Sequence, residues 1–499
     1  MNYLKKMKIN SSSDFFSNKK LIIYLILLFG VALKILYVYQ FDDYYDDWNF
    51  LYTVDPNISN EETWKRYFGD RGDFFLQEDF PYYFAFIVKF FLKIVGYSVE
   101  NTHFFLLFFS IGSFFVFMKI CDLFSKDSNF KILAIFLLIT NIFLTRELNA
   151  LRPHALTNFF GLLSLYYFIL IYLKNKNSYK NIIIFIFITL FFLSIWPLNL
   201  TLFAGQCAYI LKLCIERKGK NLLSFILPFI IVVLLYLVFN FKYLDYQVVN
   251  KSQHYTTLEA KFFINYFFRS FFGSIIFGAI FLLLFSYYLL NELIVTLKLS
   301  KYNLILFLKK LKQENVFLII IITIYSLIIL YSLIKAPVMA PKYVTILVPL
   351  IIFWVSFKIY KTKNKLIYHS IILFSFLNLL IYWNDIPIKR PPTKMVLKEI
   401  AKSETKDLFT TEFIFFNNYL QNYNISLRNN ITVQKFELEK FKKLPKNFWF
   451  LCLNNPSFAV GDNNYPDEKK CFKYKENKNL TLVKIIRYRD YILQLIKKN

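Results

Sequence analysis

The run LIIYLILLFGVALKILYVYQF (residues 21–41) decides the fold class, because it contains a single charged residue over the length of a membrane crossing. A helix needs about 20 mainly apolar residues to span the hydrocarbon core of a bilayer. The run is too long for the core of a signal peptide, and no small-residue cleavage site follows it. We therefore expect a retained transmembrane helix, and similar runs recur as far as Trp383.

The composition of the whole chain favours the same class. The chain has 499 residues, of which 57% are hydrophobic and 21% aromatic, and its mean hydropathy is +0.42. Soluble globular proteins rarely have such values. We predict a polytopic α-helical membrane protein with about 11–13 transmembrane helices. Residues 1–383 are expected to form the membrane module and residues 384–499 a small C-terminal α+β domain outside the membrane.

The formal net charge of +27 is explained by membrane topology rather than by nucleic-acid binding. Lysines gather in short loops between apolar runs, such as KNKNSYK (174–180) and KLSKYNLILFLKKLKQE (298–314). Such loops face the cytoplasm under the positive-inside rule. The pattern predicts a multi-pass protein of the inner or plasma membrane, with a cytoplasmic N-terminus and an extracytoplasmic C-terminal domain.

The same rule orients the middle of the chain. A helix over about 131–146 should run outward and one over about 155–173 inward, which leaves TRELNALRPH (145–154) outside. Segment 81–95 is short and carries two lysines, and we expect it to lie in the membrane interface.

Two outer regions show local structure in their sequences. In SNEETWKRYF (59–68), Ser59 is a candidate helix cap and Glu62 can close a capping box, and aromatic residues at helical spacing predict an amphipathic helix on the membrane. In the tail, the sequence predicts a helix over 395–403 and strands over 447–453 and 480–488.

The five cysteines and the scarce glycines limit the chemistry. Cys452 and Cys471 both lie in the outer domain, where they either form a disulfide or remain free thiols. The chain has no C-x-x-C motif and no glycine-rich phosphate loop, and it contains only 11 glycines. Nucleotide chemistry of the P-loop or Rossmann type is therefore not expected.

Acidic residues cluster around the first outer loop, residues 42–80. FDDYYDDWNF (41–50) holds four aspartates, and Glu78 and Asp79 end the loop. Because both ends of the loop meet the membrane, Asp46 and Asp47 can face Glu78 and Asp79. Such carboxylates can share a divalent metal or deprotonate an acceptor, although acids in this position can also simply solvate a loop. His254, in a later outer loop, is a further candidate ligand or a solvated residue.

Basic residues on the outer side run against the topological bias. Arg146, Arg152 and Lys342 lie there, at the depth of lipid phosphates. Arginine can clamp a phosphate with two hydrogen bonds, although long cationic side chains also reach ordinary headgroups. Acids above the membrane and cations at phosphate depth favour an enzyme that takes a group from a lipid phosphate.

Four stretches resemble the GT-C superfamily of membrane glycosyltransferases, in the branch of protein O-mannosyltransferases and lipid A aminoarabinose transferases. They occur in the order of that family: YDDWNFLY (45–52), EDFPYYFAFIVKFFLKIVG (78–96), NALRPHALTNFFGLLSLYYF (149–168) and PKYVTILVPL (341–350).

The resemblance implies an inverting transfer of a sugar from a polyprenyl-phosphate donor to an envelope acceptor, which is a glycan, lipid or protein. Asp46 takes the place of the catalytic base, with Asp47 beside it. Arg152, joined by Arg146 and Lys342, would bind the donor phosphate. Here Asp47 replaces a Glu of the family pattern and Lys342 replaces an Arg.

Two other functions are compatible with the sequence. A transporter or flippase for lipid-linked saccharides would be expected to show internal repeats and charges near mid-membrane. A non-catalytic envelope scaffold would depend more on its tail than on Asp46. The expected partners are membrane lipid, a lipid-linked sugar and its acceptor, with no nucleic acid.

Overall fold

The computed structural model places most of the chain in two compact units. It describes residues 10–40, 50–68, 82–216, 222–250, 274–334, 344–383, 393–410, 431–435, 444–453, 479–487 and 491–498. The first unit comprises residues 1–37, 106–253 and 257–382, and the second comprises residues 38–105, 254–256 and 383–499. The predicted domain boundary at residue 383 stays a prediction.

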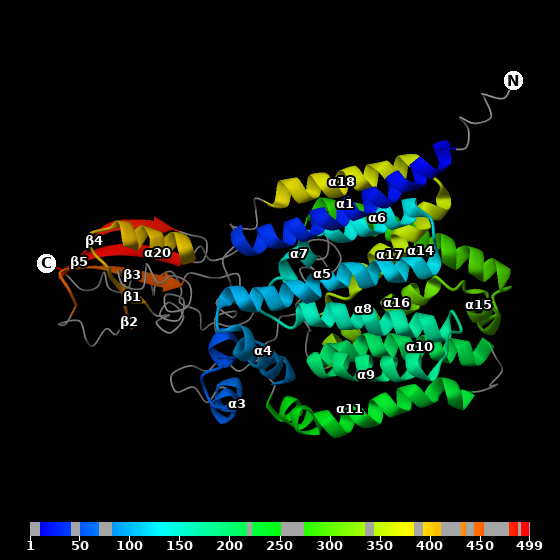
Figure 1. The fold of residues 1–499 in the computed structure, drawn as a ribbon, viewed down its shortest axis with the longest axis horizontal. Helices are drawn as coiled ribbons and strands as arrows, with labels where there is room; N and C mark the ends of the chain where they lie inside the picture. The colour runs from blue at the N-terminus through cyan, green and yellow to red at the C-terminus, as the bar shows by residue number, and fades with distance from the viewer. Residues whose placement is uncertain are drawn as a thin grey trace. The chain divides into compact units, whose positions relative to one another are not determined.

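Helices build the first unit (Figure 1). Those that lie wholly or mainly in it are α1 (Asn10–Gln40), α5 (Val99–Phe124), α6 (Ser128–Ile139), α7 (Ile142–Glu147), α8 (His154–Tyr172), α9 (Tyr179–Ile195), the 3-10 turn η1 (Pro197–Asn199), α10 (Leu200–Glu216), α11 (Leu222–Asn250), α14 (Ile275–Leu299), α15 (Leu304–Lys310), α16 (Asn315–Ile334), α17 (Leu347–Thr362) and α18 (Lys365–Trp383).

Seven described segments are long and apolar enough to cross a membrane, and three shorter apolar helices accompany them. The seven are Lys19–Tyr39, Val99–Phe124, His154–Tyr172, Pro197–Glu216, Ile275–Leu299, Asn315–Ile334 and Lys365–Trp383. The multi-pass class is therefore confirmed, while the expected number of crossings stays a prediction. Burial separates the seven: 72% of the α8 span is buried, against 17% of the α14 span. Helix α8 is thus enclosed by other helices, whereas α14 exposes most of its surface.

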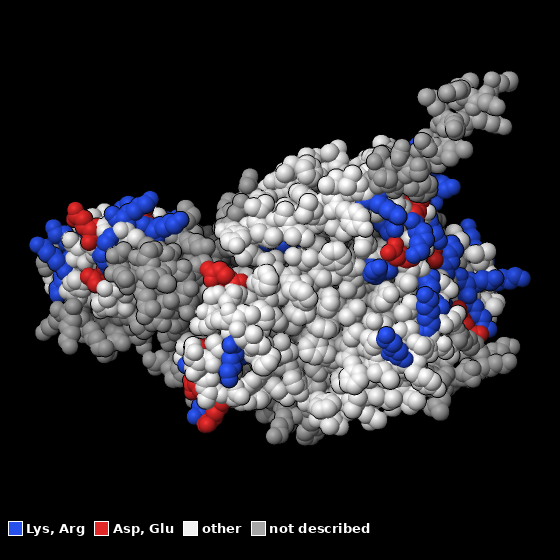
Figure 2. All heavy atoms as spheres, viewed as in Figure 1, with Lys and Arg blue, Asp and Glu red and all other residues white. Residues whose placement is uncertain are grey.

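Charged side chains gather at the end of the first unit that carries α15 (Figure 2). Behind this surface, Lys358 of α17 binds Glu292 of α14 at 2.8 Å, and Lys361 binds Glu314 at 2.9 Å. Asn315 at the start of α16 donates to Glu292 as well, at 2.7 Å. A buried charge is tolerated when it is paired and hydrogen-bonded, and this network joins three helices.

Small and polar side chains let the helices of the first unit approach closely. Such residues are typical of membrane helices, whose association relies on close packing and interhelical hydrogen bonds rather than on the hydrophobic effect. At Gly205 of α10, an added Cβ atom would lie 3.0 Å from the Cα atom of Ile320 in α16. Hydroxyl pairs cross between other helices: Thr140 and Ser375 are 2.6 Å apart, and Ser164 and Thr189 are 2.8 Å apart. These contacts fix which helices are neighbours.

One predicted helix is interrupted. The sequence favoured a single crossing over 131–146, but α6 ends at Ile139 and α7 begins at Ile142. Asn141 causes the restart, because its side chain accepts a hydrogen bond from the backbone N–H of Leu144 at 2.8 Å. The six-residue α7 then leads through a short connection into α8, which begins at His154, close to the predicted start at residue 155.

The second unit contains α3 (Asn60–Phe68), α4 (Tyr82–Val95) and the C-terminal fold. That fold is a five-stranded sheet of order β2-β1-β3-β5-β4 with α20 (Thr393–Lys402). The strands are β1 (Asp407–Thr410), β2 (Thr432–Lys435), β3 (Asn447–Leu453), β4 (Leu480–Arg487) and β5 (Tyr491–Lys498). The β1 pairings are parallel and the β5 pairings antiparallel.

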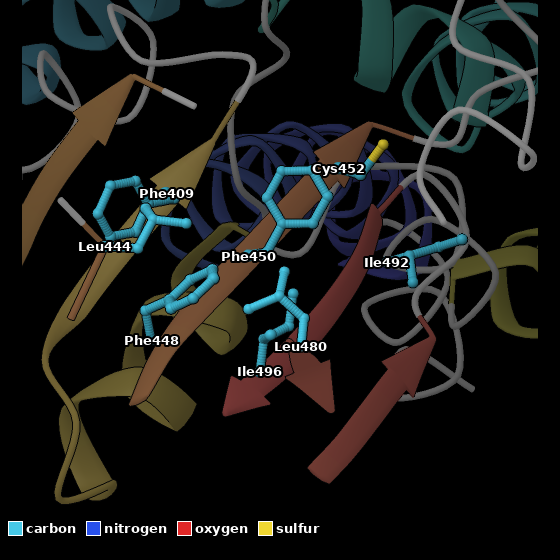
Figure 3. Packing of buried hydrophobic residues seen from close by; sticks show 8 residues of the cluster. All are labelled: Phe409, Leu444, Phe448, Phe450, Cys452, Leu480, Ile492 and Ile496. Carbon is cyan, nitrogen blue, oxygen red and sulfur yellow. The ribbon is translucent and has the colours of Figure 1, made fainter. Parts of the chain in front are cut away.

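Alternating side chains of β3 build the core of this C-terminal fold. Phe448, Phe450 and Cys452 lie in one buried cluster with residues of β4 and β5 (Figure 3). Trp449 is one residue out of phase, and its indole N–H donates to Ser403 at the end of α20, at 2.8 Å. The predicted α+β character, the helix near 395–403 and both predicted strands are confirmed.

Candidate active site

The described residues include only part of the predicted site. Asp46, Asp47, Glu78, Asp79, His254 and Lys342 all lie outside the described residues. Arg146 and Arg152 are described, and both belong to the connection between α6 and α8. The predicted meeting of acids and bases therefore stays a proposal, and the described residues near them in sequence include those of α3, α4, α7 and α8.

A buried lysine of α1 makes a hydrogen bond to helix α7. Lys34 of α1 is 1% exposed, and its ammonium donates to the carbonyl of Leu144 at 3.0 Å. That carbonyl also accepts from the backbone N–H of Leu148 at 3.0 Å, so the lysine uses the second lone pair of the same oxygen. The ammonium also lies 5.7 Å from the ring centre of Phe114 in α5. Lys34 thus fixes the segment that carries Arg146.

Arg146 is engaged by its neighbour in the chain. Its guanidinium binds the Glu147 carboxylate through Nε at 2.8 Å and Nη2 at 2.7 Å. Because this pair neutralises the arginine charge locally, Arg146 is less suited than predicted to hold a donor phosphate. Its role in phosphate binding stays a prediction, with Glu147 as a competing partner.

Arg152 precedes α8, the most enclosed of the candidate spans, and is half-buried. Near it in sequence are buried polar groups whose hydrogen-bonding capacity is unused among the described residues. Both amide atoms of Asn149, the Thr157 hydroxyl and the Asn158 carbonyl oxygen are of this kind. Buried polar atoms without partners are rare and need an explanation such as a ligand. Chain segment 149–158 is therefore the described part of the site best suited to a polar ligand.

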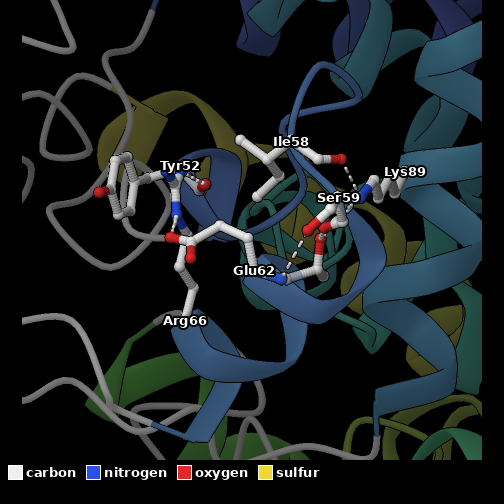
Figure 4. Close-up of polar contacts among 7 residues, drawn as sticks. Tyr52, Ile58, Ser59, Glu62, Arg66 and Lys89 are labelled. Atoms are coloured by element: carbon white, nitrogen blue, oxygen red, sulfur yellow. Dashed lines mark hydrogen bonds and ion pairs between the residues drawn. The ribbon is translucent and has the colours of Figure 1, made fainter.

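Residues 50–52, which follow the acidic pair in sequence, are each held by a different side chain. Phe50 is fully buried and stacks on Phe84 of α4, with ring centres 4.9 Å apart. The Tyr97 hydroxyl donates to the Leu51 carbonyl at 3.0 Å. Arg66 of α3 donates to the Tyr52 carbonyl at 2.8 Å, and its guanidinium lies 3.8 Å from the Tyr52 ring centre (Figure 4). Three consecutive residues are thus fixed.

Helix α3 begins as the sequence predicts but differs in two details. The Ser59 hydroxyl accepts from the backbone N–H of Glu62 at 3.0 Å, as a helix cap does. The Glu62 carboxylate, however, binds Arg66 at 2.8 Å, one turn later. The aromatic residues of α3 also pack inside the unit, since Tyr67 is fully buried and Trp64 contacts Tyr82. Packing on α4 thus accounts for the aromatic stripe.

Lys89 of α4 links α4 to the start of α3. Its ammonium donates to the Ile58 carbonyl at 2.8 Å, the Ser59 carbonyl at 3.1 Å and the Thr63 hydroxyl at 2.7 Å (Figure 4). Lys89 is only 6% exposed, whereas Lys93 on the next turn is exposed. The sequence interpretation treated both as marks of an interfacial helix, and for Lys89 burial against α3 is the reason for the residue.

Burial changes the acidity of two of these groups. Desolvation lowers the pKa of Lys89, and the nearby Asp55 carboxylate opposes that shift. Desolvation raises the pKa of Tyr97. The Tyr97 phenol therefore stays protonated, and able to donate to Leu51, at pH values where an ordinary tyrosine has begun to ionise. Lys89, Arg66 and Tyr97 were missed by the sequence reasoning, and a lysine inside an apolar helix was the one available signal.

The described residues bear on a metal site and on the state of four of the five cysteines. Among the described residues, no group of three His, Cys, Asp or Glu side chains is arranged to hold a metal ion. Cys452 is disulfide-bonded, whereas Cys121, Cys207 and Cys214 are free. Cys471, the predicted partner, lies outside the described residues, so the pairing stays a proposal.

Comparison with known proteins identifies the fold. No protein-family model matches the sequence, and no curated protein matches it significantly. The structure is similar to ArnT from Cupriavidus metallidurans in the apo state, with a TM-score of 0.51 and 9% identity over 97% of this chain and 98% of that chain. It is also similar to the same protein bound to undecaprenyl phosphate, with a TM-score of 0.50 and 8% identity over the same shares of the two chains. This chain therefore has the fold of ArnT from Cupriavidus metallidurans over nearly its full length.

Proposed function

We propose that this protein transfers a sugar from a polyprenyl-phosphate donor to an envelope glycan, lipid or protein at the outer face of the membrane. The observation that carries the proposal is the nearly full-length likeness to an enzyme solved with undecaprenyl phosphate. The unused Nδ2 group of Asn149 and the Thr157 hydroxyl, close to Arg152 in sequence, support it, because a phosphate needs several donors around one cation.

The proposed reaction is an in-line displacement at the anomeric carbon. Asp46 accepts the proton of the acceptor hydroxyl or amine, and the acceptor atom forms a bond to the anomeric carbon. The bond from that carbon to the phosphate oxygen breaks on the opposite face, which inverts the anomeric configuration. The polyprenyl phosphate leaves with its extra negative charge, and Arg152 stabilises that charge as it develops.

Two substitutions test the site assignment. Asp46→Asn removes the base and Arg152→Ala removes a phosphate ligand, and either change is expected to lower product at least about 100-fold. Lys180→Ala, an exposed residue of a lysine-rich loop, serves as the control. The readout is mass spectrometry of envelope lipids and glycans from cells with each variant, at equal amounts of membrane-inserted protein. Wild-type product in both site variants would refute the assignment.

Binding and metal dependence are measured on the purified full chain. Undecaprenyl phosphate is the probe, and Arg152→Ala should weaken its binding while Asp46→Asn should not. The acidic residues Asp47, Glu78 and Asp79 also offer oxygen ligands for a divalent metal, which transfer assays with and without EDTA address. A wild-type chain that neither binds undecaprenyl phosphate nor changes any envelope component would overturn the proposed function.

A further inference from the structure

Lys89 uses its full hydrogen-bonding capacity on one short stretch of chain. An ammonium has three donors, and here they reach the Ile58 carbonyl, the Ser59 carbonyl and the Thr63 hydroxyl at 2.7–3.1 Å. Ser59 and Thr63 are the cap and first turn of α3. The position and direction of α3 are therefore tied to a single side chain of α4.

Stability alone does not account for a cation at this place. Burial disfavours the charged form, and the N-terminal end of a helix carries partial positive charge that repels an ammonium. A methionine of similar length would pack against the same surface without the cost of removing a charge from water. What the lysine provides and the methionine cannot is direction, because three acceptors fix the start of α3.

The consequence passes along the chain toward the acidic pair. Arg66, on the last turns of α3, holds the Tyr52 carbonyl at 2.8 Å and stacks on its ring. Tyr97 holds the Leu51 carbonyl at 3.0 Å, and Phe84 of the same helix as Lys89 stacks on Phe50. Residues 50–52 follow Asp46 and Asp47 after only two intervening residues.

We propose that Lys89 is a positioning residue for the transfer reaction: through α3 and Arg66, it fixes the chain that follows the catalytic carboxylates. The inference rests on the proposed function for the meaning of the acidic pair. A catalytic carboxylate must be held within about 0.5 Å of its productive place. A displacement of about 1 Å far from the reacting atoms costs on the order of 100-fold in rate.

The experiment compares Lys89→Met with Lys93→Met, an exposed lysine on the next turn of the same helix. A third variant, Thr63→Val, keeps the size of the side chain and removes one of the three acceptors. Purified full-length proteins are measured for hydrogen–deuterium exchange over residues 50–68 and for binding of undecaprenyl phosphate. Envelope product is measured in cells at equal amounts of membrane-inserted protein.

For Lys89→Met we expect product to fall about 100-fold, while the Kd for undecaprenyl phosphate stays within about twofold of wild type. Exchange over 50–68 should rise about tenfold, and exchange over α8 should not change. Thr63→Val should lie between wild type and Lys89→Met in both exchange and product, and Lys93→Met should match wild type. The split between binding and turnover is what a merely structural residue would not produce.

Three results overturn the positioning role. They are wild-type exchange over 50–68 in Lys89→Met, wild-type product in Lys89→Met, and a loss of undecaprenyl phosphate binding equal to the loss of product. Failure of the proposed function gives a different pattern. In that case the wild-type chain itself shows neither binding nor product, whereas the exchange difference between Lys89→Met and Lys93→Met persists.

Discussion

The ammonium of Lys34 in α1 lies 3.0 Å from the carbonyl oxygen of Leu144 in α7, inside a candidate membrane span. An ionisable side chain at such a depth needs a defined partner. Here the partner is a backbone carbonyl of α7, a helix of six residues that is too short to be stable alone. Helix α7 therefore depends on a residue about 110 positions away in the sequence.

Lys34→Met tests this dependence. The change removes a hydrogen bond to a charged group, which is worth about 1.5–3 kcal/mol. Methionine also avoids the cost of burying a charge, so we expect the free energy of unfolding to fall by less than that amount. Thermal unfolding of the detergent-solubilised protein measures the effect. Lys20→Met, an exposed residue of the same helix, is the control. Equal stability of the two variants would contradict the interpretation.

The buried ion pairs between α14, α16 and α17 offer a matched comparison. Lys358 is 8% exposed and pairs with Glu292, whereas Lys361 is 45% exposed and pairs with Glu314. Lys358→Met leaves a buried carboxylate without its cation and should cost about 3–5 kcal/mol. Lys361→Met should cost less than about 1 kcal/mol, because the Lys361 side chain is exposed and Glu314 keeps the Lys358 ammonium at 3.8 Å as a second cation. A larger loss for Lys361→Met in thermal unfolding would show that burial does not control these pairs.

Gly205→Ala should separate α10 from α16. The added methyl group would lie 2.9 Å from the Ile320 Cγ2 atom and 3.0 Å from its Cα atom, so a backbone must shift. We expect a loss of about 1–3 kcal/mol in unfolding free energy. The double variant Gly205→Ala/Ile320→Ala should recover only part of the loss caused by the alanine at 205, because the new methyl group still meets the backbone at position 320. If a double-mutant cycle showed that Ile320→Ala removes the whole stability loss caused by Gly205→Ala, the clash would lie with the Ile320 side chain alone.

The buried Tyr97 phenol predicts that the free energy of unfolding falls at alkaline pH. Burial raises its pKa above the ordinary 10.0, so above that pH the unfolded state loses a proton that the folded state keeps. Stability is therefore unaffected below pH 10.0 and falls as the pH rises past that value. Tyr97→Phe should lose about 0.5–1.5 kcal/mol at neutral pH through the missing bond to Leu51, and should show a smaller further loss at high pH.

Unfolding curves of both proteins between neutral pH and pH 11, about one unit above the ordinary tyrosine value, measure the difference. Tyr39→Phe, at a position that is 76% exposed, controls for the loss of a hydroxyl elsewhere. If Tyr97→Phe and wild type lose stability in parallel above pH 10.0, the phenol is not the group responsible.

We further propose that the disulfide of Cys452 is formed with Cys471. Without reductant, the denatured chain should then alkylate only Cys121, Cys207 and Cys214, and reduction should release the other two thiols. A loop of this size contributes about 3 kcal/mol, so Cys452→Ser should destabilise the C-terminal domain by roughly that amount. Cys207→Ser is the control. Five reactive thiols before reduction would exclude the pair.

The sequence predicted those features that depend on local pattern. Apolar runs located the candidate spans, Ser59 marked the start of α3, and alternating residues marked β3 and β4. It also placed the start of α8 to within one residue. Each of these follows from side chains that are close together in the chain.

The missed features depend on distant contacts. The break between α6 and α7 requires the Asn141 cap and the Lys34 contact, while the surrounding hydropathy favours one continuous helix. The contacts of Lys89 with the start of α3 could not be predicted, because its three acceptors lie 26–31 residues earlier in the chain. The short strands β1 and β2 have four residues each and carry little local pattern, and they form because β1 pairs with β3 on one side and with β2 on the other.

Strand β4 borders the C-terminal sheet and, within the described residues, pairs only with β5. Its ladder is interrupted by a bulge between Leu482 and Lys484, and the Lys484 ammonium is held by Glu399 of α20 at 2.7 Å. A neighbouring chain that tried to add a strand here would meet an irregular hydrogen-bond register and a fixed charge. Val483, at the bulge itself, is 57% exposed, so the apolar part of this border coincides with the place where a regular added strand could not pair.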